Sequence, residues 1–277
     1  MRPRLIVMLA VAAWLLVELS PGASAGAVHV QRPAQHHHTL VPTSPGLRLP
    51  ARAAAVSSLN WAGYADVAPA GRHITSVTGN WTVPAVQLVP PGFSASWTGI
   101  GGYHTQDLIQ AGTSQDALPI GGPQYYAWYE ILPAAETPIS GCTGDPNCTV
   151  RPGDAVSVTI NSLGGTQWRI AMADAGHWTW GLTLTYASTQ SSAEWILEAP
   201  SLIAFPTLLA NVGTNTFDPG NSFVIDGATK NIAQGDPVSI QLSVVGLLTE
   251  ASPSPLDSDG DGFNACSYAT SCGPPAS

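Results

Sequence analysis

Alternation of polar and apolar residues dominates the chain from residue 57 to residue 250. In the segment 155–161, valine and isoleucine alternate with serine and threonine, and segments 76–83, 178–186 and 238–245 follow the same pattern. Glycine, proline, asparagine and aspartate separate these short runs. Such runs are typical of an antiparallel sandwich or barrel. No amphipathic helix longer than about two turns is predicted.

The N-terminus has the order of a secretory signal. Arg2 and Arg4 precede an apolar run over residues 5–17, and small residues follow up to Ala25. This order predicts a signal peptide over residues 1–25. The apolar run is too short to span a membrane comfortably, which disfavours a membrane anchor. We therefore expect a secreted, extracellular protein with no membrane partner.

Residues 26–55 form a basic segment that contains proline and histidine. They hold three arginines, four histidines and no acidic residue, and three of the histidines are consecutive at 36–38. One interpretation is a disordered linker. The other is a cationic prosegment that inhibits an acidic cleft until low pH or cleavage releases it. The consecutive histidines make only a weak metal site.

The balance of acidic and basic side chains excludes some classes of function and favours others. The 277 residues carry 9 basic and 18 acidic side chains, and charged residues make up only 10% of the chain. A protein that binds nucleic acid through its phosphates needs clustered Lys and Arg, so we expect no nucleic-acid partner. Residues 56–250, the predicted globular domain, have 14 carboxylates and four basic side chains. This balance favours carboxylate chemistry in acid, and we expect a monomer.

The four cysteines form two close pairs. Cys142 and Cys148 are six positions apart, and so are Cys266 and Cys272. In a secreted protein, pairing within each close pair is the simplest of three possible connectivities. Zinc binding is the alternative, but neither pair has the two-residue spacing or a nearby histidine typical of a zinc site.

Residues 251–277 are predicted to be an acidic tail, because a stretch rich in proline and serine opens them. Asp257, Asp259 and Asp261 alternate before a glycine, as in a calcium-binding loop. The twelfth position of such a loop is Tyr268 rather than a glutamate. A soluble acidic tail without calcium is the equal alternative.

Two predicted strands carry carboxylates that could perform chemistry. Alternation places Glu194 and Glu198 on one face of the strand 192–198. It also places Glu130 beside Trp128 and Tyr126 on the next candidate strand. Aromatic surroundings raise the pKa of a carboxyl by desolvation, which suits a general acid or base. The alternative is an ordinary solvent-facing strand side.

Six segments, in this order along the chain, resemble the glutamic peptidases, also called eqolisins. They are NWAGY (60–64), NWTVP (80–84), WTGIG (97–101), LIQAG (108–112), YAWYE (126–130) and AEWILE (193–198). The resemblance implies a two-sheet antiparallel β-sandwich of the jelly-roll or concanavalin-like type. It also implies a secreted endopeptidase that acts in acid, is made as a zymogen and needs no cofactor.

The resemblance further implies a catalytic pair, Gln110 and Glu198. Glu198 would act as base and then acid, and the Gln110 amide would hold the water and stabilise the oxyanion. Trp97, Trp128 and Glu130 would line the substrate cleft.

Glu194, on the predicted face of Glu198, is the remaining candidate for substrate binding. The chain departs from the family at Gly101, where fungal members carry aspartate, and at residues 131–132, which replace an aromatic pair. These departures affect the subsite preference and the pH optimum.

Two other functional classes compete with the peptidase. A sandwich-fold glycosidase could use Glu130 and Glu198, because paired carboxylates and tryptophans also suit sugars. A non-catalytic lectin-like module could use the same aromatic face. Gln110 favours the peptidase over the glycosidase, which has no evident need for it.

Overall fold

The structure is a computed structural model that describes residues 38, 40, 56–202, 205–244 and 248–277. The expected signal peptide lies outside the described residues, and so does the expected prosegment, except for His38 and Leu40. Among the described residues, no helix has the length and apolar character needed to cross a membrane.

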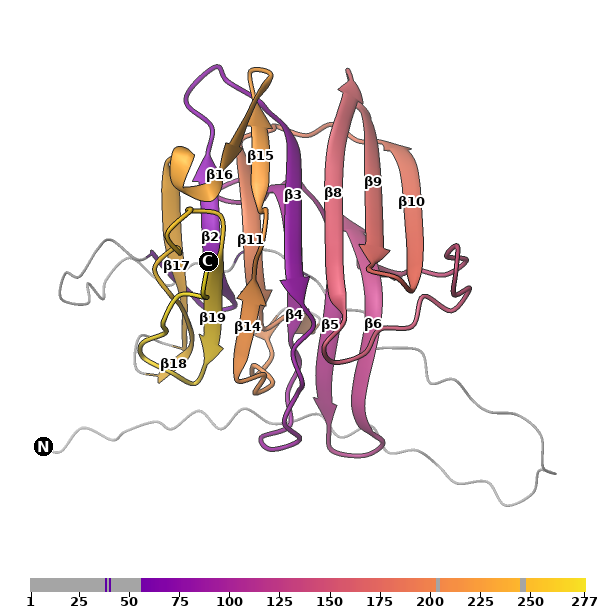
Figure 1. The fold of residues 1–277 in the computed structure, drawn as a ribbon, viewed down its shortest axis with the longest axis vertical. Helices are drawn as coiled ribbons and strands as arrows, with labels where there is room; N and C mark the ends of the chain where they lie inside the picture. The colour runs from indigo at the N-terminus through magenta and orange to yellow at the C-terminus, as the bar shows by residue number, and fades with distance from the viewer. Residues whose placement is uncertain (1–37, 39, 41–55, 203–204, 245–247) are drawn as a thin grey trace, which may run out of the picture. The chain divides into compact units, whose positions relative to one another are not determined.

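The described chain folds as two β-sheets that pack face to face, which confirms the predicted all-β antiparallel sandwich (Figure 1). The larger sheet has eleven strands, and one pair in it, between β1 and β17, is parallel. In sheet order, with β1 beside β17, its strands are β14 (Thr214–Phe217), β19 (Phe263–Ser267), β18 (Leu248–Pro253), β17 (Pro237–Val244), β2 (Trp61–Val67), β11 (Ser192–Glu198), β4 (Ala95–Gly101), β5 (Leu108–Leu118), β6 (Gly122–Ile131) and β7 (Thr137–Pro138), and β1 is Val56–Ser58.

The smaller sheet has six strands and lies in front of the larger one in Figure 1. In sheet order they are β10 (Trp178–Thr185), β9 (Gln167–Asp174), β8 (Ala155–Gly164), β3 (Ile74–Thr82), β15 (Ser222–Ile225) and β16 (Ala228–Asn231). A two-stranded ladder of β12 (Ser201–Leu202) and β13 (Phe205–Pro206) and one 3₁₀ turn, η1 (Ile232–Gln234), complete the described elements.

The main core lies between the two sheets. On β8, Val156, Val158 and Ile160 are buried while their neighbours are partly exposed, as the alternation predicts. Two core tryptophans link the sheets through their indole N–H groups. Trp195 donates to the backbone oxygen of Thr78 at 2.8 Å, and Trp81 of β3 donates to a hydroxyl of β5 at 3.0 Å. The polar tip of each buried indole is therefore satisfied.

The larger sheet also has an outer face, which points away from the smaller sheet. The alternate residues of β11 divide as predicted: Trp195 packs in the main core, and Ile196 belongs to a second apolar cluster. This second cluster includes Trp61, Trp97 and Trp128. The outer face of the larger sheet thus has a buried apolar cluster of its own, and the candidate site lies on this face.

The C-terminal residues belong to the sandwich, which differs from the tail that the sequence analysis expects. The expected edge at Glu250 falls inside β18, and β19 pairs with both β18 and β14. Phe263 is fully buried in the main core. Pro253 is the last residue of β18, which lies between β17 and β19, so the proline and serine residues mark the end of a strand rather than a domain edge.

Both predicted disulfides are present. Cys142 is bonded to Cys148, and Cys266 is bonded to Cys272. Each bridge closes a loop with a sequence separation of six residues. A short closed loop restricts the unfolded chain only modestly, so the bridges fix local loops more than they hold the sheets together.

Candidate active site

Adjacent strands bring the candidate polar residues onto the outer face of the larger sheet. In the ladder between β5 and β6, Gln110 lies directly opposite Glu130. Side chains of directly opposed residues share one face of a sheet. Gly112, two residues along β5, leaves room between Trp97 and Trp128, because a Cβ there would lie 2.6 Å and 3.0 Å from their side chains. The strand order therefore places Trp97 and Trp128 beside Gln110 and Glu130 on this face of the sheet.

Glu198 lies at the end of β11, fully buried, with a well-defined set of donors. The Asn60 side-chain amide donates to one carboxylate oxygen at 2.8 Å. The Trp97 indole donates to the other oxygen at 2.7 Å, and His38 Nδ1 lies 3.0 Å from that same oxygen. These contacts fix the orientation of the carboxylate in the second apolar cluster.

Gln110 is held by Glu130. Its Nε2 donates to a Glu130 carboxyl oxygen at 2.6 Å and lies 3.5 Å from the backbone oxygen of His38. The other end of this amide, Oε1, is buried with no hydrogen-bond partner among the described residues. The amide therefore has a donor that lies near the His38 backbone oxygen and a buried acceptor that is available for a hydrogen bond.

Burial dominates the electrostatics of Glu130. It raises the pKa of Glu130 to about 8, the negative charges of Glu198 and Glu136 add to the rise, and His38 and the Gln110 hydrogen bond oppose it. In mild acid Glu130 is thus neutral, and one of its oxygens accepts from Gln110. Glu130 therefore holds the Gln110 amide in mild acid without adding a negative charge of its own to the site.

Trp97 and Trp128 stand on either side of this space. Trp97 contacts Trp61 edge-on, with ring centroids 4.9 Å apart. Trp128 stacks on the imidazole of His38 at 4.1 Å, with the ring planes 4° from parallel. The structure thus brings together Gln110, Glu198, Glu130 and both tryptophans, as the resemblance implies for a cleft.

Glu194 lies apart from this group. It is opposite Gly99 of β4, four residues from Glu198 along β11, and fully buried. Burial raises its pKa well above the usual value, and the charges that act on it are those of Asp107 and Asp66. None of the acids of the candidate site is among the groups that shift the pKa of Glu194, so Glu194 lies in separate surroundings.

Two further residues of the site, Glu136 and His38, were not predicted from the sequence to belong to it. Glu136, in the turn before β7, is buried, and its carboxylate accepts from the Tyr126 hydroxyl at 2.8 Å and faces His38 Nε2 at 3.0 Å. Asn60 and Tyr126 were inside motifs that resemble the family, which was a usable signal. Glu136 lies six residues beyond the nearest motif, and His38 is 160 positions from Glu198.

The calcium hypothesis remains a prediction. Asp257 and Asp261 come within 4.8 Å of Asp218, so a third carboxylate joins from outside the predicted loop. Burial and these neighbouring acids raise the pKa of Asp218 to about 6. However, one Asp257 oxygen already accepts three backbone N–H groups of the loop. Asp259 is exposed.

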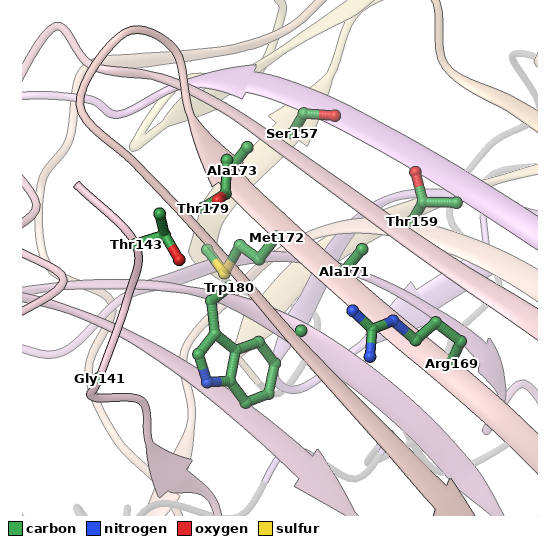
Figure 2. A pocket seen from close by; sticks show the side chains of 11 residues that line it. Gly141, Thr143, Ser157, Thr159, Arg169, Ala171, Met172, Ala173, Thr179 and Trp180 are labelled. Atoms are coloured by element: carbon green, nitrogen blue, oxygen red, sulfur yellow. The ribbon is translucent and has the colours of Figure 1, made fainter. Parts of the chain in front are cut away.

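A separate groove of about 680 Å³ lies on the outer face of the smaller sheet. Figure 2 shows Arg169, Thr159 and Trp180 among the side chains that line it. The lining includes no carboxylate, so this groove offers neither a general base nor an acid. The catalytic candidates all lie on the other sheet.

Comparison with known proteins agrees with this assignment. A sequence model of the peptidase A4 family matches residues 59–258. Aspergillopepsin-2 of Aspergillus niger is 27% identical over 259 residues, which cover 78% of this chain and 86% of that protein. The family model thus covers the chain from β2 to β18 and ends in the loop before β19.

Solved structures share the fold. The crystal structure of scytalido-glutamic peptidase with a peptide-based transition-state analogue has a TM-score of 0.61 and 17% identity, covering 76% of this chain and 98% of that one. The aspergilloglutamic peptidase of Aspergillus niger has a TM-score of 0.54 and 19% identity, covering 64% and 99%. The fold and the family match define a glutamic endopeptidase. The chain belongs to the peptidase A4 family, which sets aside the glycosidase and lectin-like alternatives.

Proposed function

We propose that this protein is a secreted endopeptidase that hydrolyses peptide bonds in acid with Gln110 and Glu198 as its catalytic pair. The observation that carries the proposal is the placement of His38 between them. The backbone oxygen of His38 faces Gln110 Nε2, and its side chain faces the Glu198 carboxylate. A peptide group therefore fits between the two candidates.

The chemistry follows from these two positions. Glu198 takes a proton from water as the water attacks the substrate carbonyl, and later gives a proton to the leaving amine. Gln110 accepts a hydrogen bond from the water through Oε1 and donates from Nε2 to the developing oxyanion. Glu130, by accepting from the same Nε2, holds the amide in the orientation that both tasks need.

The raised pKa of Glu130 supports an acid optimum. Below about pH 8 this carboxyl is mostly neutral, so it does not add a second negative charge beside Glu198. Catalysis requires the Glu198 carboxylate to act as the base when water attacks. We therefore expect activity in mild acid, where Glu130 is neutral.

Secretion and a removable prosegment complete the proposal. The N-terminal 25 residues have the order of a signal peptide, and two disulfides suit an oxidising compartment. The relative with a transition-state analogue and a related peptidase solved with the tripeptide Ala-Ile-His both bind peptides. Peptide or protein is accordingly the proposed substrate class here.

The experiment is a paired assay of the purified protein with casein and with a soluble glucan in mild acid. Peptide release without sugar release, unaffected by chelators and by serine or cysteine reagents, is the expected result. Sugar release, or complete inhibition by a chelator, would contradict the proposal.

A further inference from the structure

His38 makes four kinds of contact on the outer face of the larger sheet. Its ring stacks on Trp128, its two nitrogens lie 3.0 Å from Glu198 and 3.0 Å from Glu136, and its backbone oxygen faces Gln110. The side chain is fully buried. A histidine from the N-terminal segment therefore occupies the place that the proposed mechanism gives to a substrate.

The surroundings of the imidazole are built for a planar cation. Trp128 offers a flat aromatic surface, which attracts a cation stacked upon it. Glu136 offers a carboxylate oxygen to Nε2 of the ring, and the Tyr126 hydroxyl donates to the other oxygen of Glu136 at 2.8 Å. Glu136 has no part in the proposed chemistry, so its burial beside the site calls for another function.

We propose that Trp128, Tyr126 and Glu136 form a substrate subsite for a planar basic side chain, such as that of histidine or arginine, and that His38 fills this subsite as an internal substitute for substrate. The inference rests on the proposed function, because the subsite is defined by its position beside Glu198. Leu40 supports it, since it packs against the second apolar cluster. His38 and Leu40 therefore both contact the outer face of the larger sheet.

The charges around His38 favour this arrangement over a limited range of pH. Burial acts to lower the pKa of His38, but the charge of Glu198 and the hydrogen bonds to Glu136 and Glu198 raise it well above its usual value. Glu130 acts in the same direction, and His38 in turn lowers the pKa of Asp116. Among the described residues, the titratable groups around His38 are Glu198, Glu136, Glu130 and Asp116, together with the Tyr126 phenol that donates to Glu136. The ionic part of the contact is lost as pH rises through the raised pKa of His38.

A binding measurement tests the subsite without requiring hydrolysis. Full-length protein with His38→Gln is titrated with a fluorescent nine-residue peptide of the sequence 34–42. We expect saturable binding, at least about tenfold weaker for the same peptide with glutamine at position 38, because a charge-assisted hydrogen bond is lost. Adding Glu136→Gln to the protein should weaken binding of the original peptide by a similar factor.

Two further variants control the result. Tyr126→Phe keeps the ring but removes the hydroxyl that holds Glu136, and should weaken binding a few-fold. Asp226→Asn removes one acidic charge from the smaller sheet, at a position with φ of 51° that asparagine accepts. It should leave peptide affinity unchanged. Equal affinity for the two peptides, or equal affinity of the Glu136 variant and its parent, would overturn the inference.

Hydrolysis provides a second readout. Among peptides that differ at one position, those with histidine or arginine in the subsite should have a higher kcat/KM than those with glutamine or phenylalanine. Glu136→Gln should reduce about tenfold the ratio of kcat/KM for the histidine and arginine peptides to kcat/KM for the glutamine and phenylalanine peptides. If peptides are hydrolysed with no such preference, the subsite fails while the proposed function stands. If no peptide is hydrolysed, the proposed function fails, and the binding experiment still decides the subsite.

Discussion

At the scale of single residues, the site depends on the side-chain amide of Gln110, which a hydrogen bond to Glu130 holds in place. Gln110 has two amide hydrogens, and Glu130 accepts one of them at 2.6 Å. Nε2 also lies 3.5 Å from the backbone oxygen of His38, and Oε1 has no hydrogen-bond partner among the described residues. The orientation of this amide decides which atom meets the water and which meets the oxyanion. Glu130 therefore acts through Gln110 as a positioning residue.

Two substitutions of Glu130 separate its hydrogen bond from its charge. Glu130→Gln keeps an oxygen acceptor and should keep activity in mild acid within a few-fold. Glu130→Ala removes the acceptor, and we expect kcat to fall by about tenfold or more, because the amide is no longer held. The check is kcat and KM of both variants at several pH values. Equal losses in both variants would mean that Glu130 does not position Gln110.

Sequence reasoning reached these residues unevenly. Gln110 and Trp97 were predicted from short motifs that resemble the family, whereas strand alternation also pointed to Glu198 and Trp128. Glu136 was not found, because a lone glutamate in a turn after a strand has no local pattern. His38 belonged to a segment recognised only by its composition. Its side chain contacts Glu136 and Glu198, which are 98 and 160 positions away along the chain. No local sequence pattern predicts contacts at such separations.

At the scale of elements, alternation predicted which residues of β8 and β11 face the core, since a strand in a sandwich must separate its two sides. It failed for the last strands. β18 ends in proline, and β19 follows a loop rich in glycine and aspartate, so the sequence resembled a tail. What holds β19 is long-range packing: Phe263 stacks on Phe217 at 4.8 Å and meets Tyr64 edge-on.

The C-terminal strands should accordingly be essential to folding. Phe263→Ala is expected to lower the free energy of unfolding by about 3–5 kcal/mol, because a fully buried phenylalanine leaves a cavity. Truncation after Glu250 should prevent folding altogether. Urea titration measures the first and circular dichroism the second. Leu248→Ala, at a side chain that is 52% exposed, is the control and should change stability by less than about 0.5 kcal/mol.

At the scale of the whole molecule, buried acids should make the fold more stable in mild acid. Burial raises the pKa of Asp66 to about 7 and that of Asp218 to about 6. In the unfolded chain an aspartate titrates near about 4. Between these values the folded protein binds more protons than the unfolded chain, so the free energy of unfolding falls as pH rises. This stabilisation is complete below about pH 4 and is lost by about pH 7.

The pH dependence can be assigned to one residue. Asp66→Asn removes a group that titrates in this window, so the decrease in stability between pH 4 and pH 7 should become smaller. Urea titrations of the parent and the variant at four pH values provide the measurement. A parent protein that gains stability as pH rises from 4 to 7 would show that the buried acids do not control its stability.

The central claim is that Glu198 and Gln110 perform the chemistry, and one comparison tests it directly: kcat/KM of Glu198→Gln, Gln110→Ala and Glu194→Gln for one neutral peptide in mild acid. Loss of the base should cost about 10²–10⁴-fold, and loss of the Gln110 donor at least about 10²–10³-fold. Glu194 is four strand residues from Glu198, roughly 13 Å at about 3.3 Å per residue, so its variant should lose far less. Circular dichroism should show all three folded. An inactive Glu194 variant with an active Glu198 variant would reverse the assignment, and ordinary activity in both the Glu198 and Gln110 variants would refute it.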